Sequence, residues 1–435
     1  MTRAARRRVT GLRGPGATIT AACAIVAAAF AIAVAAFAIA VSSPAVARAA
    51  AGPQLGVTAA ILVEQNTGQR IYGLDVYREL PIASTTKLMT ALLTLEHAPL
   101  SKLLTEPQYY PAPTDSQIGL VPGERMSVHD LLLALLLPSA DDAAENLAYN
   151  VGHGSVARFI SMMNKRAQQL DLTHTHYSTP IGLDTPGNYS TASDLAKLTR
   201  YLLTTQPFFA QAVALRSAVL RTGYHQRTIA NRNTLVGRVP WIHGVKTGHT
   251  LDAGYVLVGS GRRLGMTLVS VVLGTSSEAA RNANTLALLD YGFERFRLVT
   301  PVRAGAVIAR PAVRDQPGVH AAVIAARTFT RVVATGARVS VRVQLSHRLA
   351  GPLTRHAIVG RVLVLGDGHT IGHVPLLLAR PLAAAPTSTP AARLITRPSS
   401  VVSMVVLFGA AIALALAIRR RERGRRRDQE GAGSA

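Results

Sequence analysis

The spacing of apolar and polar positions divides the middle of the chain into strands and helices. Short apolar segments bounded by turn residues are typical of strands, and longer leucine-rich segments are typical of buried helices. Strands come first, then helices, then strands again and a last helix. This order predicts an α+β fold, in which helices flank an antiparallel sheet and form a subdomain of their own. The predicted strands are 57–64, 69–72, 244–248, 254–260 and 264–273, and the predicted helices are 88–93, 126–137, 139–150, 195–204 and 278–291.

From about residue 298 the pattern changes to strands alone. Residues 339–345 alternate strictly between apolar and polar side chains, which predicts a strand with one solvated face. Residues 358–365 and 370–378 flank a Gly-Asp-Gly turn and predict a hairpin. We therefore expect an α+β domain over 50–297, called the catalytic domain below for the residues it carries, and a small all-β domain over 298–381. The second domain carries no catalytic pattern, so it is a spacer or a platform for a partner.

The amino-terminal segment has the pattern of an export signal. Residues 1–50 contain six arginines and no acid, and 17–41 is an uncharged apolar run that ends in small residues. This predicts a signal peptide over 1–49, cleaved after Ala47 or Ala49, with an uncleaved membrane anchor as the alternative. The only cysteine, Cys23, lies inside this run, so the mature chain would form no disulfide.

The carboxyl-terminal segment predicts a membrane anchor. Residues 382–400 are rich in Ala, Pro, Ser and Thr and are typical of a linker, and 401–418 form an apolar run just long enough to span a bilayer. The tail 419–435 carries two clusters of three arginines, which the positive-inside rule places in the cytoplasm. We therefore expect the domains to lie outside the cell membrane, held by this helix.

Composition limits the classes of function. The 435 residues carry a net charge of +24, about half of it in the two terminal segments. No basic run with interleaved aromatic residues occurs between the termini, which argues against nucleic-acid binding. Only five of the 47 basic residues are lysines. Arginine cannot lose its proton in a protein, so the few lysines are the candidates for a catalytic base.

One lysine lies in a pattern that suits nucleophilic catalysis. In Ser84-Thr85-Thr86-Lys87 the serine and the lysine are three residues apart at the start of a predicted helix, so both lie on one face. A serine needs a neighbouring base to act as a nucleophile, and a buried lysine with a lowered pKa can be that base. The alternative is a capping serine beside a surface lysine.

Further candidates occur later in the chain. Ser139-Ala140-Asp141 follows the leucine-rich helix, and Lys246-Thr247-Gly248 lies at or near a strand edge. Asp142 begins a helix and is interpreted as a capping residue. His174 and His176 have the spacing of metal ligands but no third ligand nearby, so neither a metal nor an organic cofactor is expected.

Together these three elements resemble the penicillin-binding protein and serine β-lactamase superfamily. The surrounding residues 81–90, 182–184, 190–192 and 244–250 are similar to those of the low-molecular-mass D-alanyl-D-alanine carboxypeptidases, peptidase family S11. The resemblance covers about 55–297 and extends weakly over 300–380. It implies a β-lactamase/transpeptidase-like catalytic domain, peptidoglycan stem peptides ending in D-Ala-D-Ala as substrate, and β-lactams as covalent inhibitors.

The resemblance also implies roles for individual residues. Ser84 would attack the carbonyl of the penultimate D-alanine, Lys87 would take its proton, and Ser139 would relay a proton to the departing D-alanine. The implied substrate contacts are Lys246, Thr247 and Gly248, the backbone N–H groups of Ser84 and His249 as an oxyanion hole, and Arg281, for which a surface arginine is the alternative.

Asp141 departs from the family pattern, which normally has asparagine at this place. An asparagine amide can donate a hydrogen bond to a substrate carbonyl, whereas an ionised aspartate only accepts. Asp141 is therefore held by Lys87, or protonated, or lowers the activity. Two other functions stay open: a β-lactamase, for which Glu145 is no clear base, and a wall-binding protein impaired in acylation.

Overall fold

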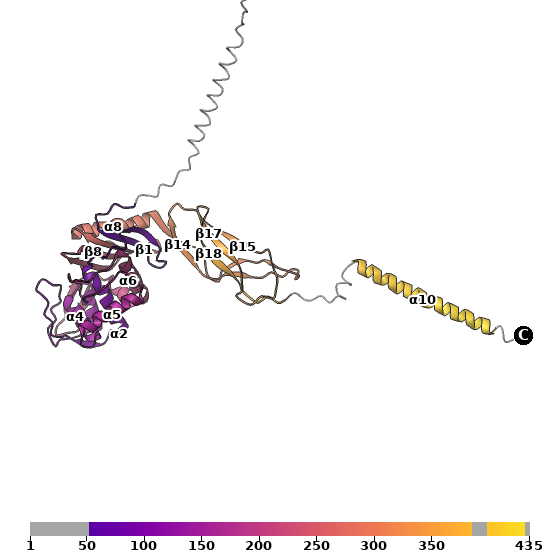
Figure 1. Ribbon diagram of the computed structural model, residues 1–435, viewed down its shortest axis with the longest axis horizontal. Coiled ribbons are helices and arrows are strands. Elements are labelled where there is room, and N and C mark those ends of the chain that lie inside the picture. The colour runs from indigo at the N-terminus through magenta and orange to yellow at the C-terminus, as the bar shows by residue number, and fades with distance from the viewer. Residues whose placement is uncertain (1–51, 385–397, 431–435) are drawn as a thin grey trace, which may run out of the picture. The chain divides into compact units, whose positions relative to one another are not determined.

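The computed structural model describes residues 52–384 and 398–430 (Figure 1). The predicted signal peptide and the middle of the predicted linker lie outside the described residues. Within residues 52–295 the structure has the predicted α+β order. Its helices flank a central antiparallel sheet, in keeping with the fold class that the residue pattern predicts.

The central sheet joins segments from the two ends of this domain. Its five strands lie in the order β2-β1-β9-β8-β7, and every neighbouring pair is antiparallel. All six residues of β1 are buried, because α8 packs on one face of the sheet and α6 on the other (Figure 1). The strands are β1 (Ala59–Glu64), β2 (Arg70–Leu74), β7 (Ile242–Thr250), β8 (Gly254–Arg263) and β9 (Met266–Thr275).

The inserted helices form a second layer of core. The helix α3 runs over Val128–Leu136 and is buried at every residue except His129. It starts two residues later than predicted, because Arg125–Ser127 pair with Leu103–Thr105 as strands β4 and β3, and Ser127 caps the helix. The other helices of this layer are α2 (Lys87–His97), α4 (Asp141–Val151) and α5 (Val156–Gln169).

Three further segments connect this layer to the sheet. The helix α6 (Ala192–Thr205) begins three residues before its predicted start, because the Thr191 hydroxyl accepts a hydrogen bond from the Asp194 N–H and caps it. The helix α8 (Glu278–Arg295) continues one turn beyond its predicted end. Between them lie α7 (Pro207–Ala212) and the hairpin β5 (Ser217–Leu220) and β6 (Arg227–Ala230).

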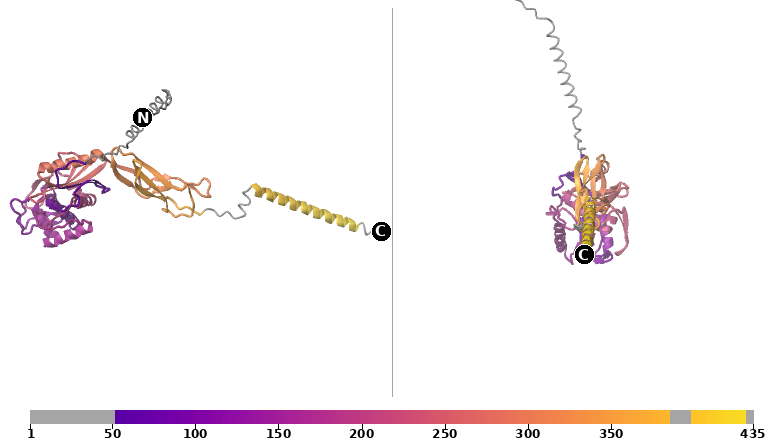
Figure 2. Two further views of the ribbon diagram at one scale, coloured as in Figure 1. Left: turned by 45° about the horizontal axis from the view of Figure 1, so that its top comes forward. Right: turned by 90° about the vertical axis from the view of Figure 1, so that its right-hand side faces the viewer.

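Residues 296–378 form only strands, as expected for the second domain. The domain is drawn in orange in Figure 2. Its main sheet has the order β11-β13-β18-β17-β15 and a core that is mostly valine and leucine. The strands are β10 (Phe296–Val302), β11 (Val307–Ala309), β12 (Ala312–Val313), β13 (Val323–Ala325), β14 (Phe329–Ala334), β15 (Val339–Leu345), β16 (Arg348–Leu349), β17 (Ile358–Gly366) and β18 (His369–Leu378). We call residues 298–384 the β domain.

One expectation about this domain is wrong. The alternation over 339–345 predicts one buried face, but both faces of β15 are accessible, with Val341 48% and Val343 42% exposed. The reason is that β15 is the last strand of its sheet. Its valines lie beside the buried valines of β17 but have no strand on their other side.

The described carboxyl-terminal part is one long helix, α10 (Pro398–Glu430). Its stretch Val402–Arg421, which ends in three arginines, is long and apolar enough to cross a membrane, by length and composition alone. No other helix among the described residues meets this criterion. The predicted span 401–418 lies within α10, and the helix continues into the predicted tail.

Candidate active site

Ser84 lies in a tight turn that leads into helix α2. The turn, Ala83–Thr86, is a 3-10 helix, and α2 begins at Lys87, so Ser84 lies just before the amino-terminus of α2. Residues three apart eclipse each other in a 3-10 turn. The Lys87 Nζ therefore lies 3.1 Å from the Ser84 Oγ.

Lys87 is fully buried and fully hydrogen-bonded. Besides Ser84, its Nζ contacts the Asp141 Oδ1 at 2.5 Å and the Ile181 carbonyl at 2.6 Å. Three acceptors match the three N–H groups of an ammonium. Burial lowers the pKa of Lys87 below its usual value, and the nearby Asp141 carboxylate opposes this only in part. Lys87 is thus poised to lose a proton more easily than an ordinary lysine.

A second serine and lysine pair lies beside the first. Ser139 occupies the turn between α3 and α4 with a φ of 70°, and Lys246 comes from the edge strand β7. The Lys246 Nζ donates to the Ser139 Oγ at 2.8 Å and to the Thr247 carbonyl at 3.0 Å. Burial first, and the positive charge of Lys87 next, lower the pKa of Lys246 well below its usual value. Two buried amines therefore share one small region.

Two glycines allow the backbone to approach Ser84 closely. A Cβ on Gly248 would lie 2.9 Å from the Ser84 nitrogen and 2.8 Å from the Val256 Cγ2. A Cβ on Gly182, whose φ is +88°, would lie 2.1 Å from the Ala83 carbonyl oxygen. Any other residue at these positions would push β7 or the loop around residue 182 away from the serine. Glycine here therefore sets the width of the site.

Seven of the nine predicted site residues line one cleft of about 470 Å³. The other two, Lys87 and Lys246, are buried and bond to serines that line it. The His249 ring packs against Tyr255 at a centroid distance of 4.0 Å. The predicted residues that line the cleft are Ser84, Ser139, Asp141, Thr247, Gly248, His249 and Arg281.

The two adjacent aspartates have different environments. Asp141 is turned towards Lys87, which is the first of the three alternatives for this residue, while it still lines the cleft. The sequence predicts that Asp142 acts as a helix cap, but in the structure it also binds a second segment of the chain. Its buried carboxylate accepts hydrogen bonds from the backbone N–H groups of Ile118, Gly119 and Leu120. It therefore holds the loop before α3 against the start of α4.

Two arginines of the cleft differ from what the sequence predicts: the surface alternative for Arg281 is wrong, and Arg232 was not predicted. Arg281 is not a surface residue, because only 5% of its side chain is exposed and it pairs with Glu278. Arg232 also lines the cleft and contributes positive charge near both lysines. The sequence offers no signal for Arg232 or for the Ile181 carbonyl, because both come from loops whose paths depend on the tertiary structure.

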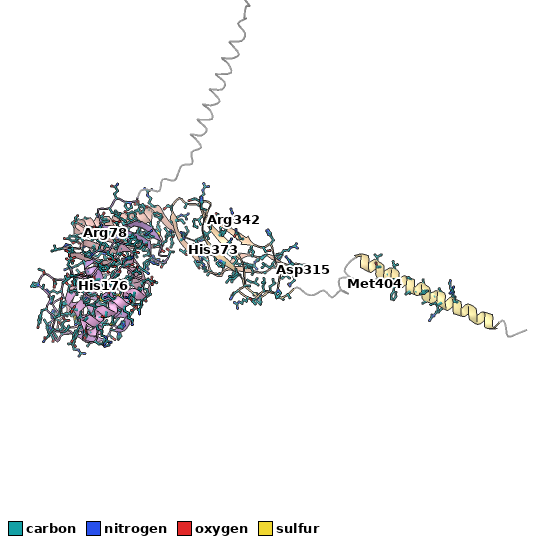
Figure 3. The ribbon with its side chains drawn as sticks, viewed as in Figure 1. Arg78, His176, Asp315, Arg342, His373 and Met404 are labelled. Carbon is teal, nitrogen blue, oxygen red and sulfur yellow. The ribbon has the colours of Figure 1, made fainter. Side chains whose placement is uncertain are left out.

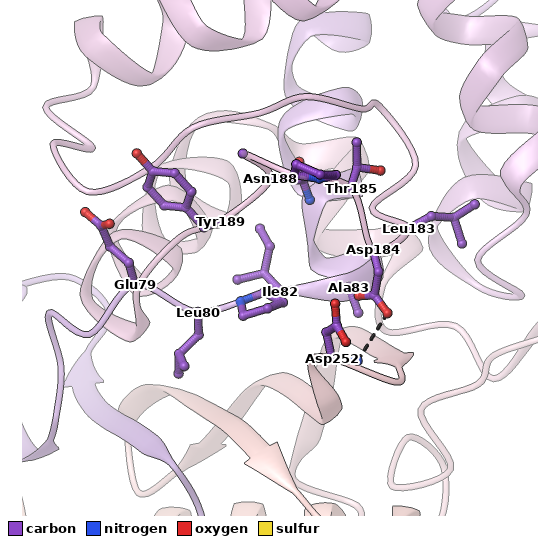
Figure 4. Close-up of a pocket in the computed structure, with 13 residues that line it drawn as sticks. Glu79, Leu80, Ile82, Ala83, Leu183, Asp184, Thr185, Asn188, Tyr189 and Asp252 are labelled. Carbon is purple, nitrogen blue, oxygen red and sulfur yellow. Dashed lines mark hydrogen bonds between the residues drawn. The ribbon is translucent and has the colours of Figure 1, made fainter.

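A second hollow, of about 430 Å³, adjoins the cleft at Leu183 (Figure 4). It is lined by Glu79, Asp184 and Asp252, and the Asp252 N–H donates to Asp184. No serine and lysine pair lines it. His176 contacts the Gly187 carbonyl beside this hollow, and among the described residues no group of side chains is arranged to hold a metal.

Comparisons with known proteins agree with this geometry. A family model described as D-alanyl-D-alanine carboxypeptidase matches residues 46–277. The carboxypeptidase DacC of Escherichia coli is 30% identical over 346 residues, which are 75% of this chain and 84% of that protein. DacF of Bacillus subtilis is 26% identical over 73% of this chain and 84% of that protein.

Solved structures give the same picture. Penicillin-binding protein 5 of Haemophilus influenzae aligns with a TM-score of 0.66 at 27% identity, over 76% of this chain and 98% of that one. The Streptomyces K15 DD-transpeptidase aligns with a TM-score of 0.54 at 31% identity, over 56% of this chain and 98% of that one. The chain belongs to the D-alanyl-D-alanine carboxypeptidases, peptidase family S11.

Proposed function

We propose that the chain is a serine-type D-alanyl-D-alanine carboxypeptidase, which removes the terminal D-alanine from peptidoglycan stem pentapeptides through an acyl-enzyme on Ser84. The observation that carries this proposal is the 3.1 Å contact between the Ser84 Oγ and the Nζ of the buried Lys87. It joins a nucleophile to a base whose pKa is lowered by burial.

In the acylation step, neutral Lys87 accepts the proton of Ser84 while its Oγ attacks the carbonyl carbon of the penultimate D-alanine. The negative charge on the carbonyl oxygen is stabilised by the backbone N–H groups of Ser84 and His249. Each such donor contributes about 3 kcal/mol to transition-state stabilisation. The close approach of Gly248 to the Ser84 nitrogen supports this assignment.

The intermediate then collapses with cleavage of the peptide C–N bond. The leaving amine takes the proton that Lys87 accepted from Ser84, relayed through Ser139, so that Lys87 is neutral again. Ser139 lies between the cleft and Lys246. Water next attacks the ester on Ser84, releases the shortened peptide and restores the hydroxyl. Thr247, Lys246 and Arg281 supply hydrogen bonds and positive charge for the terminal carboxylate of the substrate.

For the location of the enzyme, we propose that α10 spans the cell membrane and that the catalytic domain lies on its extracytoplasmic side. The apolar stretch Val402–Arg421 and the arginine-rich residues that follow it support this orientation. The same cleft would take β-lactams as covalent inhibitors of Ser84.

Two alternative functions compete with this proposal, a β-lactamase and a protein impaired in acylation. A β-lactamase needs an efficient base for deacylation, and Glu145, although burial raises its pKa, is not among the residues of the cleft. A protein impaired in acylation is favoured by the bond between Asp141 and Lys87, which holds the base in its charged form.

A fluorescent penicillin and a peptide assay separate the three functions. A carboxypeptidase is labelled at Ser84 for a long time and releases D-alanine from a stem pentapeptide. A β-lactamase turns the label over rapidly, and an impaired protein stays folded without being labelled. Absence of D-alanine release from well-folded protein would refute the proposal.

A further inference from the structure

The β domain is far more basic than the catalytic domain that precedes it. Residues 298–381 contain eleven arginines, no lysine and two aspartates, a net charge of +9 over 84 residues. Residues 51–297 contain 21 basic and 18 acidic residues, a net charge of +3 over 247 residues. The positive charge is therefore concentrated in the domain that has no proposed catalytic residue.

These eleven arginines are all exposed, and none has an acidic partner. No ion pair involves any basic residue of 298–384, whereas the preceding part of the described chain has six ion pairs between Lys or Arg and Asp or Glu. Asp315 and Asp367 are too few to neutralise them. Exposed guanidinium groups without an acidic partner remain available to a ligand that carries phosphate or carboxylate groups.

Four of these arginines belong to backbone segments at the end of the β domain from which the chain leaves it. Ala312 and Val313 pair with Arg348 and Leu349, and the Arg314 N–H donates to the Leu349 carbonyl. At the same end a bridge joins Leu353 to Leu382 through two backbone hydrogen bonds of 2.9 and 2.8 Å.

Two more arginines flank that bridge. Arg355 follows Leu353 and Arg380 precedes Leu382, so both belong to this end of the domain. Figure 3 labels Asp315, the only acid here, farther along the domain than Arg342 and His373. We call Arg314, Arg348, Arg355 and Arg380 the basic end.

The basic end is tied closely to the helix that can cross a membrane. Only residues 385–397 separate Ala384 from the start of α10, and the apolar stretch begins at Val402. Thirteen residues can reach no farther than about 45 Å. The basic end is thus confined near any bilayer that α10 enters, where the local concentration of lipid headgroups is high.

We propose that the basic end docks on the anionic phospholipid headgroups of the membrane that α10 spans. Arginine forms paired hydrogen bonds with phosphate, and each basic residue at an anionic surface strengthens its binding about fivefold. Docking would hold the β domain at the bilayer surface. The inference rests on the proposed membrane span of α10 and not on the proposed reaction.

The test uses the full chain with Cys23→Ser and a dye on Ala350→Cys, an exposed position next to the basic end. The protein is reconstituted in nanodiscs of phosphatidylcholine, alone or mixed with phosphatidylglycerol, that carry an acceptor dye on a headgroup. We expect energy transfer to rise with phosphatidylglycerol and to fall at high salt, since exposed charges are screened.

A charge-matched pair of variants locates the effect. Arg314→Gln, Arg348→Gln, Arg355→Gln and Arg380→Gln together should abolish most of the rise, while retaining D-alanine release from a soluble peptide. The control removes four exposed arginines of the catalytic domain, Arg78, Arg158, Arg216 and Arg238, and should keep the full rise. Equal energy transfer in both variants, or in both lipids, would overturn the proposal.

Two more measurements distinguish this proposal from two alternatives, membrane insertion of α10 alone and binding of a phosphate polymer. Flotation with neutral vesicles tests the span alone, and a protein that floats with neither neutral nor anionic vesicles contradicts the docking. The basic end could instead bind soluble polyphosphate, with energy transfer that is the same with and without phosphatidylglycerol. Its partner is then a phosphate polymer, and the membrane proposal is wrong.

Discussion

The catalytic domain and the β domain use charge in opposite ways. In the catalytic domain several charges are buried and paired with an acid or base of the same chain, as in Lys87 with Asp141 and Arg227 with Glu124. In the β domain every arginine is exposed and none is paired with an acid. The first arrangement fixes geometry and shifts pKa values, whereas the second leaves charge free for an external partner.

This difference shows that the net charge of a domain does not predict what a given arginine contributes to stability or binding. Removal of a buried partner leaves an uncompensated charge in a poorly solvated place, but removal of an exposed one changes mainly the surface potential. The same substitution should therefore have very different consequences in the two domains.

The largest effect should follow loss of the nucleophile. Ser84→Ala removes the Oγ that forms the ester, so D-alanine release from a soluble peptide should fall by about 10⁴-fold or more. The matched control Ser101→Ala, at an exposed serine, should leave the rate unchanged. Strong covalent labelling of Ser84→Ala by a fluorescent penicillin would place the acylated residue elsewhere.

The next largest effect compares two arginines directly. Arg227 is 8% and Glu124 0% exposed, and they form an ion pair of 2.7 Å. Arg227→Met should lower the free energy of unfolding by about 3–5 kcal/mol, because Glu124 would stay buried without its partner. Arg342→Met, on the exposed strand β15, should change it by less than about 0.5 kcal/mol. Urea unfolding measures both, and equal losses would remove the distinction between the domains.

This pair also predicts how stability depends on pH. Burial alone would raise the pKa of Glu124, but hydrogen bonds from Arg227 and Tyr224 outweigh it and leave the pKa below its usual value. A carboxyl group with a lowered pKa stabilises the fold above its unfolded pKa and loses this contribution as the pH falls. The difference in stability between wild type and Arg227→Met should therefore shrink in acid.

A smaller effect should follow a single added methyl group beside Ser84. Gly248→Ala would place its Cβ within 2.9 Å of Ala83, Ser84 and Val256, so β7 must move. We expect a loss of about 1–3 kcal/mol in stability and a marked fall in acylation rate. Gly336→Ala in the β domain meets no atom within 4 Å and should be neutral. Thermal unfolding and penicillin labelling test the pair.

The sequence predicted elements well where the local pattern and the tertiary contacts agree. The leucine-rich helix and the strands β7, β8 and β9 appear close to their predicted positions. Their buried positions require apolar residues, so the spacing of apolar residues in the sequence reveals these elements. The face of β15 could not be predicted, because accessibility of Val341 and Val343 depends on being the last strand of a sheet. Periodicity describes one strand, while exposure depends on its neighbours.

The same limit applies to the cleft. Short motifs carry Ser84, Lys87 and Lys246, so their residue types could be selected from the sequence. The burial of Lys87, the role of Asp142 in the loop before α3, and the position of Arg232 depend on contacts between segments far apart in the chain. Chemistry that depends on such contacts, above all the pKa of Lys87, needed the structure.

Substitution of Asp141 should have the smallest effect on the reaction, but it tests the proposed base most directly. Asp141 is the buried charge that favours the protonated form of Lys87. Its carboxylate raises the pKa of Lys87, in opposition to the larger effect of burial. Asp141→Asn removes this negative charge, so the pKa of Lys87 should fall further. The neutral amine is the base, and the acid limb of kcat/KM for penicillin acylation should therefore move to lower pH, with a severalfold faster reaction near neutrality.

The pH profile separates the charge of Asp141 from its missing amide. Loss of charge shifts the acid limb but leaves the rate at high pH unchanged, because Lys87 is neutral there in both proteins. A new hydrogen bond from the asparagine amide to the substrate instead raises the rate at high pH. Asp115→Asn, in the same cleft, removes a weaker influence on Lys87 and should shift the limb less. An unchanged limb in Asp141→Asn would mean that Asp141 does not hold Lys87 in its charged form, and that burial alone tunes the base.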